Sequence, residues 1–211
     1  IKVSAMPVTG YTATGAASMY AALGDAEKAY YYLDFLIQHK NVSPTTMYAE
    51  GNPVIESPLS FATCVHDMLL QSMGGIIKVF PGTPERWGDA AFHHLRTQGA
   101  FLVSAKKEQG QTLFVVVESL IGSACIVQPD IENPHIYIGG KDFSTSERIK
   151  KDNNGFYTID LKKGETAIFT AALLEETDLS IEAIPVSKEN RNLFGFSKKT
   201  ERLLGHNFYS K

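Results

Sequence analysis

The sequence is poor in the features that assign a chain at once to a class of protein. Cysteine occurs twice and tryptophan once in 211 residues. No apolar run reaches the length of about 18 residues that a membrane-spanning helix needs. Twenty basic residues stand against 23 acidic ones, so the chain lacks the basic excess of a nucleic-acid-binding protein. We therefore expect neither a nucleic acid nor a membrane as partner.

The motifs of several common enzymes are also absent. The chain contains no GxxxxGK[ST], GxGxxG, GxSxG or HExxH pattern, so nucleotide binding, serine hydrolysis and zinc proteolysis lose their usual markers. Cys64 and Cys125 belong to no CxxC pair or metal-spaced cluster. They are interpreted either as two buried thiols or as a disulfide. We expect no cofactor and no metal.

What the chain does have is enough apolar sequence for a core. Hydrophobic residues make up 44% of it, which suits one large domain or two small ones. The sequence begins at Ile1 rather than at methionine, and its first ten residues are typical of a loop. We expect a piece of a longer protein, or a processed product.

Residues 1–75 have the pattern of helices. An alanine-rich run ends at Gly24, which suits a left-handed stop, and Asp25 can cap the helix that follows. Helical spacing places four apolar residues of the second helix on one face, namely Ala29, Leu33, Leu36 and Ile37. After a long loop, Ser57 suits the N-cap of a third helix and Pro58 its first position. The apolar stripe expected there is Leu59, Ala62, Val65, Leu69 and Met73.

From residue 76 the hydrophobic period changes to two. A hairpin is predicted around Gln109-Gly110, and Lys163-Gly164 is expected to turn the last pair of strands. Short strands at regular intervals over residues 76–174 predict an antiparallel β-sandwich. The tail, residues 175–211, carries no clear period. Helices followed by strands make the predicted fold class α+β.

Glu56 is the strongest candidate for chemistry in this sequence. Its place beside the start of the third helix favours a negative charge, and an ionised carboxylate suits a general base. The alternative is a solvated loop acid or a capping aid. Glu50 shares the same loop, and two carboxylates near one sugar can hydrolyse a glycoside. The alternative is chance, because two acids in one loop are common.

Three further places carry residues that recur in functional sites. His66 fits a buried or boundary histidine better than a catalytic group, and Trp87 fits either a hydrophobic anchor or a platform for a sugar ring. His93 and His94 stand beside Arg96. Adjacent residues of a strand point to opposite faces, so joint metal chelation by the two histidines is not expected.

The run from Glu56 to about residue 105 resembles the end of the catalytic domain in glycoside hydrolase family 95, the α-L-fucosidases and their relatives. The matching segments are "MLLQSMGG" at 68–75, "PGTPERW" at 81–87 and "LRTQGAF" at 95–101. The resemblance covers residues 45–120 best. It implies that residues 1–75 are the last helices of an (α/α)6 toroid and that residues 76–174 are the C-terminal β-sandwich.

The same resemblance implies a role for Glu56, which falls where the family carries its general-base aspartate. The family pattern Asp-Gly-Asn-Phe-Gly reads Glu-Ser-Pro-Leu-Ser here, from Glu56 to Ser60. The family's general acid lies further upstream than Ile1. The implied function is the C-terminal part of an inverting α-L-fucosidase-like or related α-glycoside hydrolase, inactive alone.

The implied partners are a carbohydrate and the missing upstream helical domain. Candidate sugar contacts are Glu50, Asn52, His66 and Trp87. The implied location is extracellular or periplasmic. The alternative function is a non-catalytic β-sandwich that has a structural role or binds carbohydrate.

Overall fold

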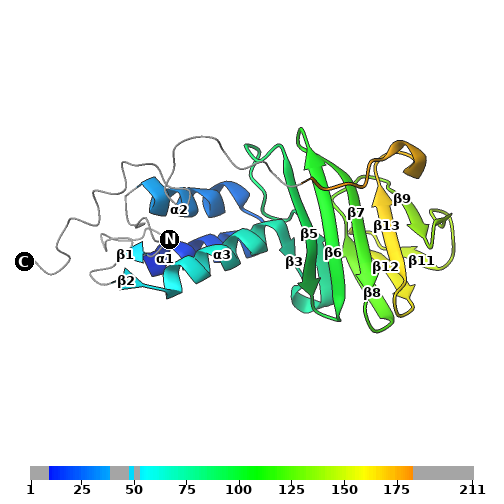
Figure 1. The fold of residues 1–211 in the computed structure, drawn as a ribbon, viewed down its shortest axis with the longest axis horizontal. Coiled ribbons are helices and arrows are strands. Elements are labelled where there is room, and N and C mark those ends of the chain that lie inside the picture. The colour runs from blue at the N-terminus through cyan, green and yellow to red at the C-terminus, as the bar shows by residue number, and fades with distance from the viewer. Residues whose placement is uncertain (1–9, 39–47, 50–52, 183–211) are drawn as a thin grey trace, which may run out of the picture. The chain divides into compact units, whose positions relative to one another are not determined.

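The chain folds into two compact units, each described here by itself. In a computed structural model, residues 10–38, 48–49 and 53–182 are described. One unit comprises Ile1–Met68 together with Ile184–Lys211, and the other comprises Leu69–Ala183. The first holds the helices and the second holds the large sheets (Figure 1). The predicted α+β class is confirmed. Of the expected tail, residues 175–211, the part beyond residue 182 lies outside the described residues.

Two helices of the first unit pack against each other as a hairpin. Helix α1 spans Gly10–Ala22 and helix α2 spans Ala26–Gln38. Gly24 between them has a positive φ of 76°, the left-handed conformation predicted for it. Asp25 accepts a hydrogen bond from the backbone N–H of Lys28 at 3.2 Å, as an N-cap should. The rings of Tyr20 and Tyr32 stack across the pair at 5.7 Å.

The third helix, α3, spans Glu56–Leu69 and so begins earlier than predicted. Ser57 lies buried inside its first turn and is not the N-cap. Pro58 is tolerated at this position because the first N–H groups of a helix have no intrahelical acceptor to lose. The short strands β1 (Tyr48–Ala49) and β2 (Pro53–Val54) pair antiparallel just before it.

The buried face of α3 differs from the predicted stripe. Its buried residues are Ser57, Cys64 and Met68, whereas Leu59 is 61% exposed. The predicted buried face of α3 was chosen from its larger apolar side chains. Alanine, serine and cysteine are small enough to lie on either face, so their position was not predicted. In α2 the predicted face is buried at Ala29, Leu33 and Leu36, but Ile37 is 47% exposed.

The second unit is built from two sheets. The six-stranded sheet has the order β10-β9-β13-β7-β6-β5, and the five-stranded sheet has the order β11-β12-β8-β4-β3. The first contains β5 (Ala90–Thr97), β6 (Phe101–Glu108), β7 (Gln111–Ser119), β9 (His135–Ile138), β10 (Lys141–Asp142) and β13 (Thr166–Thr170). The second contains β3 (Leu70–Gln71), β4 (Ile76–Val79), β8 (Ser123–Gln128), β11 (Ile149–Lys151) and β12 (Tyr157–Leu161). Two 3-10 turns, η1 (Met73–Gly75) and η2 (Leu174–Glu176), complete the unit.

Antiparallel pairing dominates both sheets, with one exception. Strands β4 and β8 pair parallel, Ile76 opposite Ile126, where the sequence predicted an antiparallel sandwich. The chain leaves the five-stranded sheet after β4, builds β5 to β7 in the other sheet, and then returns as β8. That excursion lets two successive strands of one sheet run in the same direction.

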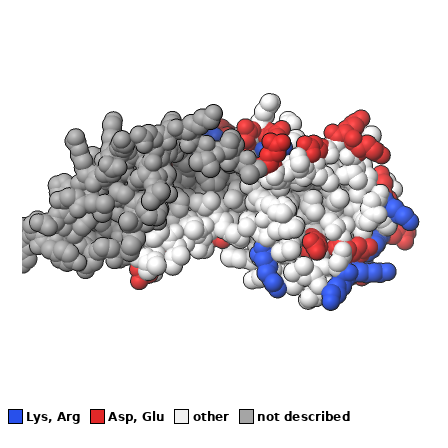
Figure 2. Space-filling view, viewed as in Figure 1, with Lys and Arg blue, Asp and Glu red and all other residues white. Residues whose placement is uncertain are grey.

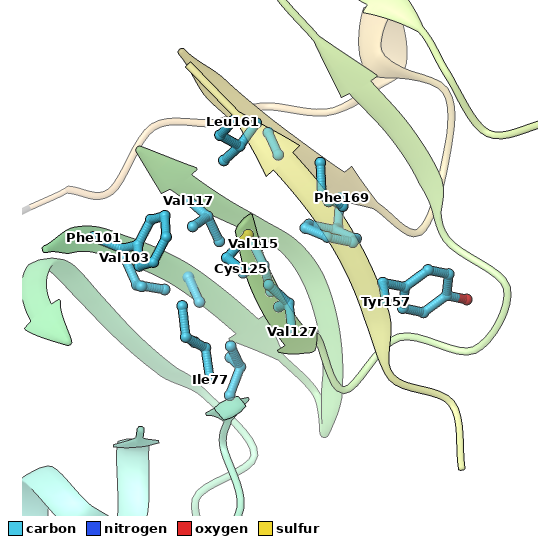
Figure 3. Packing of buried hydrophobic residues seen from close by; sticks show 14 of the residues in the cluster. Ile77, Phe101, Val103, Val115, Val117, Cys125, Val127, Tyr157, Leu161 and Phe169 are labelled. Atoms are coloured by element: carbon cyan, nitrogen blue, oxygen red, sulfur yellow. The ribbon is translucent and has the colours of Figure 1, made fainter. Parts of the chain in front are cut away.

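The core lies between the two sheets and follows the predicted period of two. Val103, Val115, Val117, Val127 and Phe169 are buried in it, and Figure 3 shows such side chains converging from both sheets. The Gln109-Gly110 hairpin forms as predicted, with both residues at positive φ. Residues 162–165, by contrast, do not turn a hairpin. They carry the chain from β12 in one sheet to β13 in the other.

Candidate functional site

Glu56 is the first residue of α3, and its side chain is exposed. At this position the free N–H groups and the dipole of the helix favour a negative charge. Two apolar residues close to it in the chain are exposed, Ile55 at 60% and Leu59 at 61%. A carboxylate at a helix N-terminus, flanked by uncovered apolar side chains, could abstract a proton from a water placed beside it.

Two other predicted site residues, Glu50 and Asn52, lie outside the described residues. The strands that flank them are described, and Tyr48 pairs with Val54 while Ala49 pairs with Pro53. Glu56 therefore follows directly after a short antiparallel pair. The predicted pairing of Glu50 with Glu56 stays a prediction.

A polar cluster between α1 and α3 was not predicted from the sequence. Ser18 of α1 hydrogen-bonds to Cys64 and to Asp67 of α3. Burial raises the pKa of Asp67, and the neighbouring His66 and the Ser18 hydrogen bond act in the opposite direction. His66 itself is half-buried. No sequence signal links Ser18 to this pair, because helix α2 and more than 15 further residues separate α1 from α3 in the chain.

The second acid of α3 cannot serve as a catalytic partner of Glu56. Asp67 follows Glu56 by eleven positions on one helix, which corresponds to about 16 Å at 1.5 Å per residue. The two carboxyls of an inverting glycosidase lie roughly 6.5–9.5 Å apart. Within the described part of the unit, Glu56 is thus the acid at the helix start, and Asp67 belongs to the packing of α1 on α3.

Trp87 belongs to the other unit, in the connection between β4 and β5. Its side chain is half-buried, and its backbone N–H donates to the carbonyl of Pro84 at 2.9 Å. This short turn fixes the backbone of the residue. Trp87 and Glu56 belong to different units, and the choice between a hydrophobic anchor and a sugar platform for Trp87 stays open.

The two adjacent histidines contradict the expectation that they point apart. A β-bulge interrupts β5 between Phe92 and Leu95, and His94 has a φ of 53°. The bulge turns both rings to the same side, where they stack at 3.8 Å between centroids. The backbone N–H of His94 donates to Ser104 Oγ at 3.0 Å. The two ring planes lie 20° from parallel.

The structure also describes the possible metal ligands and the two cysteines. Within residues 10–38, 48–49 and 53–182, no group of three or more His, Cys, Asp or Glu side chains is arranged to hold a metal ion. Cys64 and Cys125 are free and buried, so the disulfide alternative is not realised. Burial raises the pKa of Cys64 to about 11 and that of Cys125 to about 12, so neither is a ready nucleophile.

No protein-family model and no curated protein sequence matches the chain. Among the described helices, none is both long enough and apolar enough to cross a membrane.

Proposed function

We propose that the chain is the C-terminal part of an inverting glycoside hydrolase, acting on an α-L-fucoside or a related α-glycoside, with Glu56 as general base. The observation that supports this most is the position of Glu56, exposed at the first turn of α3. The motif segments at 68–75, 81–87 and 95–101 support the same assignment. The enzyme would act outside the cytoplasm.

In the proposed step, Glu56 accepts a proton from a water molecule while the water oxygen attacks the anomeric carbon. The bond from that carbon to the leaving oxygen breaks, and a general acid protonates the leaving oxygen. The configuration at the anomeric carbon inverts. Glutamate is one methylene longer than the aspartate of the family pattern, so the attacking water would sit further from the helix.

The general acid is proposed to come from further helices that pack on α1. This helix has no charged residue, and its buried stripe runs along Gly10, Ala13, Ala17 and Ala21. A second stripe at helical spacing is exposed, namely Tyr11 at 58%, Gly15, Met19 at 64% and Ala22. A helix that is apolar on both sides is typical of one packed between two layers. This second face supports the proposal of an upstream helical domain.

The test is Glu56→Gln in the longer protein that the proposal implies, assayed on aryl α-L-fucosides and α-galactosides. Glutamine keeps the shape and removes the base. Loss of a general base lowers the rate typically by roughly 10²–10⁴-fold, and we expect a fall of that size in kcat.

Glu27→Gln is the matched control, because Glu27 is also an exposed glutamate in the first turn of a helix, α2. It should leave kcat within about twofold, since it has no proposed part in proton transfer. If Glu56→Gln hydrolyses the substrates as fast as Glu27→Gln, Glu56 has no part in the mechanism.

A non-catalytic module is the second candidate, and the sandwich favours it because it has a complete core between its own two sheets. The two candidates separate in an assay of the 211-residue chain and of the longer protein. Hydrolysis by the longer protein but not by the 211-residue chain supports the proposal of a glycoside hydrolase. Carbohydrate binding by the chain with no hydrolysis by either protein supports the module.

A further inference from the structure

The outer face of the six-stranded sheet carries side chains that are buried without belonging to the core. Phe114 is 1% exposed and Thr170 is fully buried, and the two are paired across β7 and β13. Their neighbours Val115 and Phe169 point into the space between the sheets. Because side chains alternate along a strand, Phe114 and Thr170 point the opposite way, toward the outside of the sandwich.

The segment from 171 to 182, here called the strap, follows β13 and contacts the sheet next to these residues. It crosses the sheet at the end where β6 finishes, β7 begins and β13 finishes (Figure 1). The N–H of Ala171 donates to the carbonyl of Leu113, and the N–H of Leu174 donates to the hydroxyl of Tyr137 at 3.2 Å. Thr170 Oγ1 donates to the carbonyl of Ala172 at 2.6 Å.

Opposite charges on the sheet and on the strap lie near one another. Lys106 on β6 pairs with Glu108 at 2.8 Å, and that hydrogen bond is the main reason that the pKa of Lys106 is raised. The charges of Asp178 and Glu182 on the strap raise it further. Figure 2 shows acidic side chains gathered along the rim where η2 lies. These are exposed charges, which water and salt screen.

A groove of about 380 Å³, open to solvent, lies along the strap. It is lined by Lys106, Glu108, Leu113, Ala171, Ala172, Glu176, Thr177 and Asp178. Side chains that face this groove contact water on one side rather than protein atoms. Leu173 at the start of the strap remains 44% exposed. On the sheet side the strap hydrogen-bonds to Leu113 and Tyr137, and the rest of the strap borders a groove that is open to water.

We propose that the strap is a displaceable cover, which opens as a unit while both sheets stay folded and so uncovers an apolar patch at Phe114 and Tyr137. Segments with few buried contacts open at lower free energy than the core they lie on. This device is independent of Glu56 and of the proposed hydrolysis.

The experiment measures thiol labelling in the folded chain. Thr170→Cys places a thiol under the strap, while the native Cys125 lies between the sheets and serves as the internal reference. Labelled peptides are separated by mass, so each site reports its own opening. We expect the thiol at position 170 to react roughly 100-fold faster than Cys125, because only the strap has to move. Equal rates at the two positions would overturn the proposal.

A second variant tests the proposal even if Thr170→Cys by itself loosens the strap. Tyr137→Phe removes the acceptor of the Leu174 N–H and leaves the ring in place. Added to Thr170→Cys, it should speed labelling at 170 by about fivefold, the value of one ordinary hydrogen bond, with Cys125 unchanged. No acceleration, or the same acceleration at both sites, would contradict a strap that opens on its own.

Discussion

At the scale of single residues, the bulge in β5 shows how one backbone conformation decides what two side chains can do. His93 and His94 look in the sequence like alternating strand residues. A left-handed φ of 53° at His94 instead puts both rings on one side. Histidine tolerates this conformation better than branched residues do, but it still costs free energy. The N–H of His94 finds a partner in Ser104, which helps to hold the bulge.

The bulge predicts opposite effects for two neighbouring substitutions. His94→Gly should raise the free energy of unfolding of the sandwich by about 0.5–1 kcal/mol, because glycine adopts positive φ without strain. His93→Gly should lower it by about 0.5–1 kcal/mol, because glycine weakens an ordinary strand position. Urea unfolding followed by Trp87 fluorescence measures both. Destabilisation of equal size by the two variants would mean that His94 is not strained.

At the scale of elements, the two corners of the sandwich are joined by one ion pair. Arg148, ahead of β11, donates to both carboxylate oxygens of Glu165, ahead of β13. The same guanidinium donates to the carbonyl of Asp160 at 2.7 Å, and Glu165 accepts from the N–H of Lys162 at 2.9 Å. The connection 162–165, which was expected to be a hairpin turn, is thereby fixed as a crossover between sheets.

This pair predicts a pH-dependent contribution to stability. The hydrogen bond from Arg148 lowers the pKa of Glu165, with the Lys162 N–H adding to it. A carboxylate with a lowered pKa in the folded state stabilises above its unfolded value, near 4.3, and that contribution is lost as the pH falls through the folded pKa. Glu165→Gln should therefore cost about 1 kcal/mol at pH 7 and almost nothing at pH 2.5. Urea unfolding at both pH values tests it, and a pH-independent cost would contradict the account.

The sequence was a good guide to elements where side-chain period decides the structure. Strands β6 and β7 and the Gln109-Gly110 turn followed from alternation and a glycine at positive φ. The sequence could not predict which sheet each strand joins, because the side chains of a strand such as β12 would alternate in the same way in either sheet. The buried face of α3 was also missed, because Ser57 and Cys64 are small residues that hydrophobicity ranks below Leu59. Ser18 could not be found, as its partners come from a distant helix.

At the scale of the whole molecule, the two units differ in how much of their apolar surface each buries within itself. The sandwich has a core enclosed by two sheets. The helical unit buries alanines of α1, and it exposes large apolar side chains such as Tyr11, Met19 and Leu59. Its stability is expected to depend on partners more than that of the sandwich does.

Two probes should therefore report two unfolding transitions for the 211-residue chain. The single tryptophan, Trp87, lies in the sandwich unit, whereas helices α1 and α2 lie entirely in the other unit. Ellipticity at 222 nm should fall at a lower urea concentration than Trp87 fluorescence changes, because the helical unit has the smaller core. Coincident transitions would show that the two units unfold together.

The most direct measurement on the proposed function is chemical rescue of Glu56→Ala in the longer protein. Azide attacks an anomeric carbon without needing a base, so it can replace the water that Glu56 would activate. With an activated glycosyl fluoride as substrate, azide is predicted to restore turnover by roughly tenfold or more and to give a glycosyl azide of inverted configuration. A variant as active as the parent, or one that azide does not rescue although it is folded and binds substrate, would contradict a general-base role for Glu56.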